Sequence, residues 1–363
     1  MKPALDCLHH VEREQETGQV RNQAMPREVR SEKPGTTRRL LALTITLGLA
    51  MLTPLVAAAF QSSYQTTTPA TSQPFTGALD PHPTVALTFD DLPAAGSLPP
   101  GENRAKIAAV LAAELKSNHL EGTYGFVNAV KLENDPDAQQ ALRIWVAAGM
   151  NIGNHTWSHV SLTASTAESF EREIALDEPA LARYASARDW RWFRYPFLWE
   201  GDTLDKRRAV RSWLQEHGYR VAQVTLDFED YAWNDAYARC SAKPDEAAIA
   251  WLRQSYLDNA AEYIRLGREE SRIAFGREIP NVLLLHATAF TALMLPDLVD
   301  LLRQQGFRFA TLPEVEQDPA YALDPDAALQ YGGTLPDQFM DSRLLPYPPF
   351  KPKPFDKLKS LCR

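Results

Sequence analysis

Beyond residue 80, short apolar runs alternate with longer stretches in which apolar residues recur at helical spacing. The short runs, rich in β-branched and aromatic residues, predict strands at Val85–Phe89, Tyr124–Val127, Met150–Ile152, Trp192–Tyr195, Val221–Leu226, Val282–Leu285 and Phe307–Ala310. The longer stretches predict helices at Glu102–Lys116, Pro136–Ala148, Ala167–Ala185, Leu204–His217, Asp245–Arg272 and Leu293–Gln305. Strands that alternate with helices predict an α/β fold: about seven parallel strands with covering helices, open or closed into a barrel.

The chain before residue 81 predicts two segments outside the folded domain. Residues 1–60 form a leader in which the stretch 40–60 carries no charge, as is typical of a secretory signal peptide or a membrane anchor. A start at Met25 gives a leader of more usual length, so we expect translation to begin there. Residues 61–80 are rich in Ser, Thr, Pro and Gln, which predicts a flexible linker. Either form of leader places the domain outside the cytoplasm, in the periplasm or the extracellular space.

The rest of the chain divides into a domain and a tail. Residues 81–317 predict one α/β domain, and residues 318–363, dense in Pro, Asp and Tyr, predict an extended tail that either wraps this domain or is solvated. Loss of the leader would leave two cysteines, Cys240 and Cys362. In an oxidising compartment these two predict a disulfide that ties the tail to the body.

Composition narrows the class of protein. Hydrophobic residues make up 45% of the chain and charged residues 23%, which is enough apolar surface for a substantial core. The chain has 38 Lys and Arg against 46 Asp and Glu, a net charge of −8. This balance argues against a nucleic-acid partner, which requires a concentrated excess of basic charge.

Ionisable residues stand where the predicted strands end. They are Asp90, Asp91, His155, His159, Arg194, Asp227, Asp230 and His286. The carboxyl ends of the strands in a parallel barrel share one face, and that face carries the active site. We therefore expect five separate segments to deliver these groups to one place.

Three of these residues suit a catalytic metal. His155 and His159 are four residues apart, which on a helical turn places both imidazoles on the same side. Asp91 would complete a set of three ligands with open positions, as catalytic zinc requires. Each signal is weak alone, because surface histidines often have this spacing and an Asp-Asp-Leu-Pro sequence also suits a plain turn. Their coincidence at one barrel face favours a metal site.

Five segments resemble, in order, the five motifs of the polysaccharide deacetylases, the NodB-homology or carbohydrate esterase family 4 enzymes. They are Thr88-Phe89-Asp90-Asp91, His155-Thr156-Trp157-Ser158-His159, Arg194-Tyr195-Pro196-Phe197, Asp227-Phe228-Glu229-Asp230-Tyr231 and Leu284-Leu285-His286. The resemblance implies a distorted (β/α) barrel and a metal-dependent hydrolase that removes acetyl groups from sugars.

The resemblance also implies a role for each matching residue. Asp90 is the general base, supported by Arg194, and His286 is the general acid, tuned by Asp230. The metal ligands are Asp91, His155 and His159. Residues expected to bind substrate are Pro196, Phe197, Trp199, Tyr231 and Leu284, the last two around the acetyl group. Arg194 has an alternative partner in Glu200, and Asp227 is either a supporting hydrogen-bonding residue or a strand-end cap.

The chain departs from the family pattern in two places that affect the substrate groove. Phe197 is followed by Leu198-Trp199-Glu200-Gly201 where the family continues with an aromatic residue and Gly, and Tyr231 stands where the family has Trp. The aromatic residues beside the motifs, Trp157, Trp199, Tyr231 and Trp233, offer flat faces for sugar rings or pack in the core.

The sequence therefore predicts an exported deacetylase of acetylated amino sugars that uses a divalent metal, zinc first, with cobalt, nickel or manganese as alternatives. Its partner would be an acetylated glycan such as a chitooligosaccharide or peptidoglycan, with membrane attachment through residues 40–60 if the leader is retained. Two alternatives remain: a carbohydrate-binding protein without catalysis on the same scaffold, and an esterase or amidase for O-acetyl or non-sugar substrates.

Overall fold

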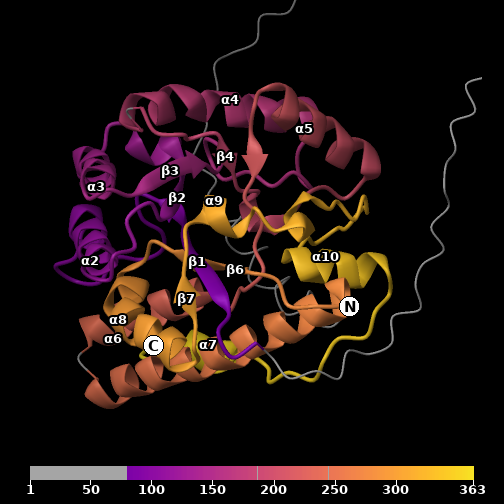
Figure 1. Cartoon of the computed structure of the whole chain (residues 1–363). Helices are drawn as coiled ribbons and strands as arrows, with labels where there is room; N and C mark the ends of the chain where they lie inside the picture. The colour runs from indigo at the N-terminus through magenta and orange to yellow at the C-terminus, as the bar shows by residue number, and fades with distance from the viewer. Residues whose placement is uncertain (1–79, 186, 244) are drawn as a thin grey trace, which may run out of the picture. The chain divides into compact units, whose positions relative to one another are not determined.

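A seven-stranded sheet, in which every strand pair is parallel, organises the chain (Figure 1). The structure is a computed structural model and describes residues 80–185, 187–243 and 245–363. The strands are β1 (Thr84–Leu92), β2 (Tyr124–Val127), β3 (Asn151–Asn154), β4 (Trp192–Phe193), β5 (Arg220–Val221), β6 (Asn281–His286) and β7 (Arg308–Phe309). Their order is β5-β4-β3-β2-β1-β6, and β7 pairs with the start of β1.

The segment 220–226 connects the two edges of the sheet, because it pairs with β4 at its start and with β6 at its end. At its start the N–H of Ala222 donates to the carbonyl of Phe193 in β4 at 2.7 Å. At its end Leu226 forms a parallel bridge with Leu283 of β6. The predicted strand Val221–Leu226 is thus regular only in β5, because the chain leaves β4 midway to pair with β6. The expected distorted barrel is confirmed.

Helices lie around the sheet (Figure 1). The longer ones are α2 (Arg104–Ser117), α3 (Pro136–Ala147), α4 (Ala167–Tyr184), α5 (Leu204–Glu216), α6 (Asn234–Ala242), α7 (Glu246–Phe275) and α8 (Ala289–Gln304). Short elements are the 3-10 helices η1 (Ala129–Leu132), η2 (Pro196–Leu198), η3 (Asp230–Trp233) and η4 (Pro319–Ala322), and the helix α9 (Leu312–Val315). The long helix α7 begins where the Asp245 side chain accepts a hydrogen bond from the N–H of Ala248. It ends at Gly276, whose φ of 70° lets the chain turn away.

The strand β1 shows how the sheet directs side chains to two cores. Leu87 and Phe89 belong to the apolar cluster beneath the helices, whereas Ala86 belongs to a separate cluster. Because successive side chains in a strand point to opposite faces, Thr88 and Asp90 lie on the same face as Ala86, opposite to Leu87 and Phe89. Burial on both faces explains why the strand appears as an almost continuous apolar run.

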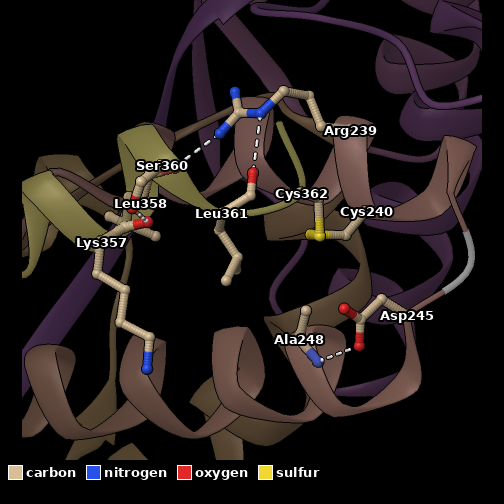
Figure 2. The surroundings of a disulfide bond; sticks show 9 residues. All are labelled: Arg239, Cys240, Asp245, Ala248, Lys357, Leu358, Ser360, Leu361 and Cys362. Atoms are coloured by element: carbon tan, nitrogen blue, oxygen red, sulfur yellow. Dashed lines mark hydrogen bonds between the residues drawn. A yellow bond between two sulfur atoms is a disulfide. The ribbon is translucent and has the colours of Figure 1, made fainter.

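The segment after residue 317 is not a plain extended tail. It contains α10 (Leu335–Ser342) and α11 (Phe355–Ser360), and it packs on the domain because Leu335, Phe339, Met340 and Leu358 are buried there. Figure 2 shows its end, where Cys362 forms the predicted disulfide with Cys240 of α6. The segment that carries α10 and α11 therefore packs against the domain and is joined to it by the disulfide.

The leader, the linker and the membrane attachment through residues 40–60 lie outside the described residues. Among the residues from 80 onward that the structure describes, no helix combines the length and the apolar character that a membrane span requires.

Candidate active site

The predicted metal ligands Asp91, His155 and His159 lie together at the carboxyl ends of β1 and β3. Each offers one ligand atom, and these atoms all lie within 4.8 Å of one another. The Nε2 atom of His159 lies 3.7 Å from an oxygen of Asp91. One carboxylate and two imidazoles that converge in this way form a donor set suited to a divalent transition metal.

His155 is held so that one ring nitrogen is available. Its Nδ1 lies 2.8 Å from the carbonyl oxygen of Arg194, which can only accept, so Nδ1 carries the proton. Burial lowers the pKa of His155 well below its usual value, and the nearby His159 lowers it further. The imidazole is therefore neutral, with a lone pair on Nε2, as a metal ligand requires.

The loop that carries the two histidines corrects the expectation of a helical turn. Thr156 and His159 both have left-handed backbone, with φ of 63° and 58°. The side chain of Asn128 donates to the carbonyl oxygens of His155 and Thr156 at 2.7 and 3.0 Å. The rings still meet, with centroids 4.8 Å apart, but the loop places them, not helical spacing.

Asp91 contacts a residue that the sequence analysis did not single out. The ammonium group of Lys131, in η1, lies 3.2 Å from the Asp91 carboxylate and donates to its backbone oxygen at 3.1 Å. Burial raises the pKa of Asp91, but Lys131 and the imidazoles outweigh burial and hold the pKa well below its usual value. The carboxylate is thus ionised. No local pattern marks Lys131, because its position depends on how η1 packs beside β1.

Asp90 is buried beside the predicted metal ligands and paired with Arg194. The Nη1 atom of Arg194 donates to Asp90 Oδ1 at 3.2 Å, while Nη2 donates to Thr88 and Nε to the carbonyl oxygen of Ala222. Burial raises the pKa of Asp90 to about 6, although Arg194 and His286 act against it. The alternative partner, Glu200, instead pairs with Arg207 and Arg211.

His286 lies at the end of β6, the strand that pairs with β1, and is in register with Asp90. Its Nδ1 lies 2.7 Å from Oδ1 of the fully buried Asp230, and its backbone N–H donates to Asp230 Oδ2 at 3.0 Å. Thr291 also donates to that oxygen, at 2.6 Å. Burial lowers the pKa of His286, but Asp230 outweighs this and raises it to about 10.

Aromatic residues border this centre on two sides. Phe197, with a left-handed φ of 60°, meets His159 at a ring distance of 4.5 Å. Trp199 packs on Phe197 at 5.1 Å, and Tyr331 packs on Trp199 at 5.4 Å. Tyr331, from the segment after the predicted domain, was not anticipated because nothing local links it to the motifs. Tyr231 lies 4.9 Å from the ring of His286.

The other predicted substrate residues are less exposed. Pro196 is buried in η2, and Leu284 is buried in a small cluster with Leu198 and Val224. Trp233 is fully buried and its indole N–H donates to Ser255 at 2.8 Å. It is therefore a core residue, which is the second of the two alternatives that the sequence left open for these aromatic residues.

Asp227 borders the centre as well. Its Oδ1 accepts the backbone N–H of Glu229 at 2.7 Å, which closes the turn that leads into η3. Burial raises the pKa of Asp227 to about 6, partly opposed by Lys353 and His286. This local contact is that of a strand-end cap, which is one of the two roles that the sequence predicts for Asp227.

The chain resembles known proteins over part of its length. Residues 79–222 match the family model for polysaccharide deacetylase. A chitin deacetylase from Arthroderma benhamiae is 26% identical over 236 residues, which is 65% of this chain and 52% of that protein. The chain thus spans about half the length of this curated relative.

Two solved structures are also similar. The chitin deacetylase of the fungal pathogen Colletotrichum lindemuthianum matches with 21% identity and a TM-score of 0.44, over 64% of this chain and 88% of that one. A CE4 family pseudoenzyme from Bacillus anthracis matches with 15% identity and a TM-score of 0.44, over 64% and 65% of the two chains.

Proposed function

Because residues 79–222 of this chain match the family model for polysaccharide deacetylase, we propose that the site hydrolyses the acetyl groups of acetylated amino sugars with a divalent metal. The observation that carries the proposal is that three groups of side chains lie together. The ligand set Asp91, His155 and His159 adjoins the Asp90–Arg194 pair, with His155 Nε2 3.6 Å from Asp90 Oδ2, and His286, bound to Asp230, is in register with Asp90. These are the groups that amide hydrolysis requires.

The ligand set fits a metal, with zinc as our first proposal and cobalt, nickel or manganese as alternatives. Asp91 is ionised, and the Nδ1–H of His155 donates to a carbonyl oxygen, which leaves Nε2 free to bind. A cation bound there would lower the pKa of water and polarise the acetyl carbonyl.

Asp90 and Arg194 supply the base. Since Asp90 Oδ1 accepts from Arg194, Oδ2 is the oxygen that takes a proton from the attacking water. The carboxylate is available for this above its pKa of about 6. Arg194 keeps it oriented while the proton arrives.

His286 supplies the acid. Its Nδ1 is bound to Asp230, so Nε2 is the atom that gives a proton to the departing nitrogen. With a pKa near 10, the ring carries this proton at neutral pH. An amine leaves poorly without protonation, so this transfer is needed for an amide.

The neighbouring side chains would select the substrate. We propose that Tyr231 and Leu284 enclose the acetyl group, and that Phe197 and Trp199, backed by Pro196, contact sugar rings. Export supports the choice of a glycan, since the proposed leader and the Cys240–Cys362 disulfide both suit an oxidising compartment.

Acetate release from chitooligosaccharides and from peptidoglycan fragments tests the proposal. We expect turnover after zinc loading, loss of turnover with a chelator, and loss in Asp90→Asn and His286→Ala with the fold intact by circular dichroism. Asp300→Asn, the same change at an exposed position of α8, should keep full activity. Glycan binding without acetate release under any metal would support the binding-protein alternative, and faster release from O-acetyl esters would support the esterase.

A further inference from the structure

The last residues of the chain form a strap, residues 347–362, that runs beside α7. The N–H of Lys351 donates to Glu262 at 3.1 Å, and Tyr263 donates to the carbonyl oxygen of Lys351 at 3.3 Å. Arg265 donates to the carbonyl oxygen of Pro349 at 3.0 Å. Three consecutive contacts on one helix therefore fix the first half of the strap.

The second half of the strap is fastened to α6. Figure 2 shows Arg239 donating to the carbonyl oxygens of Leu358 and Leu361, at 2.6 and 3.1 Å. Directly beside it, Cys240 is joined to Cys362. The strap is thus held at both ends, and the residues between them have little freedom to move away.

Lys353, between these two anchors, points into the domain. Its ammonium group lies 2.9 Å from Glu229 and 4.1 Å from the centre of the Tyr263 ring. The side chains of Lys353 and Glu229 are only 10% and 13% exposed. Burial lowers the pKa of Lys353, but Glu229 and Asp227 outweigh burial and raise it. The pair is shielded from water, so removal of one partner would leave an uncompensated buried charge on the other.

Glu229 belongs to the turn that places the acid. Its backbone is left-handed, with a φ of 56°, and its N–H is bound to Asp227 at 2.7 Å. The next residue, Asp230, holds both the ring and the backbone of His286. A shift of Glu229 would therefore shift Asp230 and the ring that it orients.

The turn carries two carboxylates that repel each other. Asp227 and Glu229 lie close enough for each charge to act on the other, and Lys353 opposes that repulsion. Without the ammonium group, the turn would keep two buried carboxylates and lose the cation that pairs with Glu229. Such a turn would relax by moving one carboxylate toward solvent.

We propose that Lys353 is a positioning residue for the acid His286: by holding Glu229 it fixes the turn 227–230 so that Asp230 meets the imidazole. The inference rests on the proposed function for the role of His286. The C-terminal strap is then part of the active site's support, although it lies far along the chain from the five motifs.

The test compares Lys353→Ala, Lys353→Arg and the control Lys351→Ala, which removes an exposed charge from the same strap. We expect Lys353→Ala to lower kcat for acetate release about tenfold, since a misplaced acid slows the chemical step, and to change KM by less than about twofold. Lys353→Arg should restore most of kcat, and Lys351→Ala should match the wild type. An unchanged kcat in Lys353→Ala would overturn the proposal.

Amide hydrogen exchange separates this inference from the proposed function. In Lys353→Ala we expect faster exchange in residues 227–230 and at the N–H of His286, with the strands β1 and β2 unchanged. This readout needs no substrate, so it stands even if the wild type releases no acetate. If Lys353→Ala speeds exchange throughout the domain, the experiment uses Glu229→Gln instead, which keeps the shape of the side chain and removes its charge. Unchanged local exchange in a folded variant would overturn the inference.

Discussion

Asp230 binds His286 through both of its oxygens, one to the ring Nδ1 at 2.7 Å and one to the backbone N–H at 3.0 Å. The carboxylate is fully buried and also accepts from Thr291. The ring therefore has one orientation, with Nε2 toward the site. The same contact gives the imidazolium a buried negative partner, which is why the pKa rises to about 10 despite burial.

Asp230→Asn should move the basic limb of the pH profile. The wild-type acid keeps its proton until the pH approaches about 10, so activity falls only above that value. Removing the negative charge lowers the pKa of His286, so the fall should begin at lower pH. The kcat profile for acetate release between pH 6 and 11 measures this, and a basic limb that stays in place would refute the assigned role.

Asp90→Asn should abolish turnover without loss of the metal. The change keeps the size of the side chain but removes the proton acceptor, and general base catalysis contributes about 100- to 10,000-fold to the rate. We expect kcat to fall in that range while zinc still binds by titration calorimetry. Retained activity would place the base elsewhere.

Variants around Asp91 should change metal affinity in opposite directions. Asp91→Asn removes a charged ligand, and we expect zinc binding to weaken more than about 100-fold, beyond the loss typical of supporting residues. Lys131→Met removes a cation 3.2 Å from the same carboxylate, so zinc should bind several-fold more tightly. Competition with a chromogenic chelator measures both, and weaker binding by Lys131→Met would contradict this interpretation.

Replacing Cys240 and Cys362 by Ser should lower stability. The bridge closes a loop of 122 residues, and its removal is expected to cost about 2–5 kcal/mol by enlarging the unfolded ensemble. Urea unfolding of the oxidised protein and of the double variant gives the difference. Equal midpoints would show that the contacts of Arg239 with the same segment suffice alone.

The sequence predicts that the side chains of the candidate site lie together, because each strand of a parallel barrel ends at the same face. Asp90, Asp91 and His286 follow apolar runs that matched β1 and β6 closely, so the pattern alone brought them together. Arg194 follows β4 directly, and its contact with Asp90 agrees with the role that we propose.

What the sequence missed depends on tertiary packing. Lys131 contacts Asp91 from a 3-10 helix, whereas Tyr331, which packs on Trp199, and Lys353, which contacts Glu229, come from the C-terminal segment. No periodicity or spacing in these segments refers to the site. The histidine loop was misjudged for a related reason. Its backbone is held by Asn128, a residue far from it in sequence, which donates to the carbonyl oxygens of His155 and Thr156.

The left-handed residues at the centre have a consequence for laboratory evolution. Asp91, Thr156, His159 and Phe197 all have positive φ, and each such residue without a glycine costs about 1–2 kcal/mol. Glycine at any of these positions would remove that cost. It would also remove a proposed metal ligand at Asp91 or His159, the side chain of Thr156, or the aromatic ring of Phe197. A library selected only for thermal stability would therefore accumulate glycine at these four positions. Its most stable variants would then be the least active on the proposed substrate.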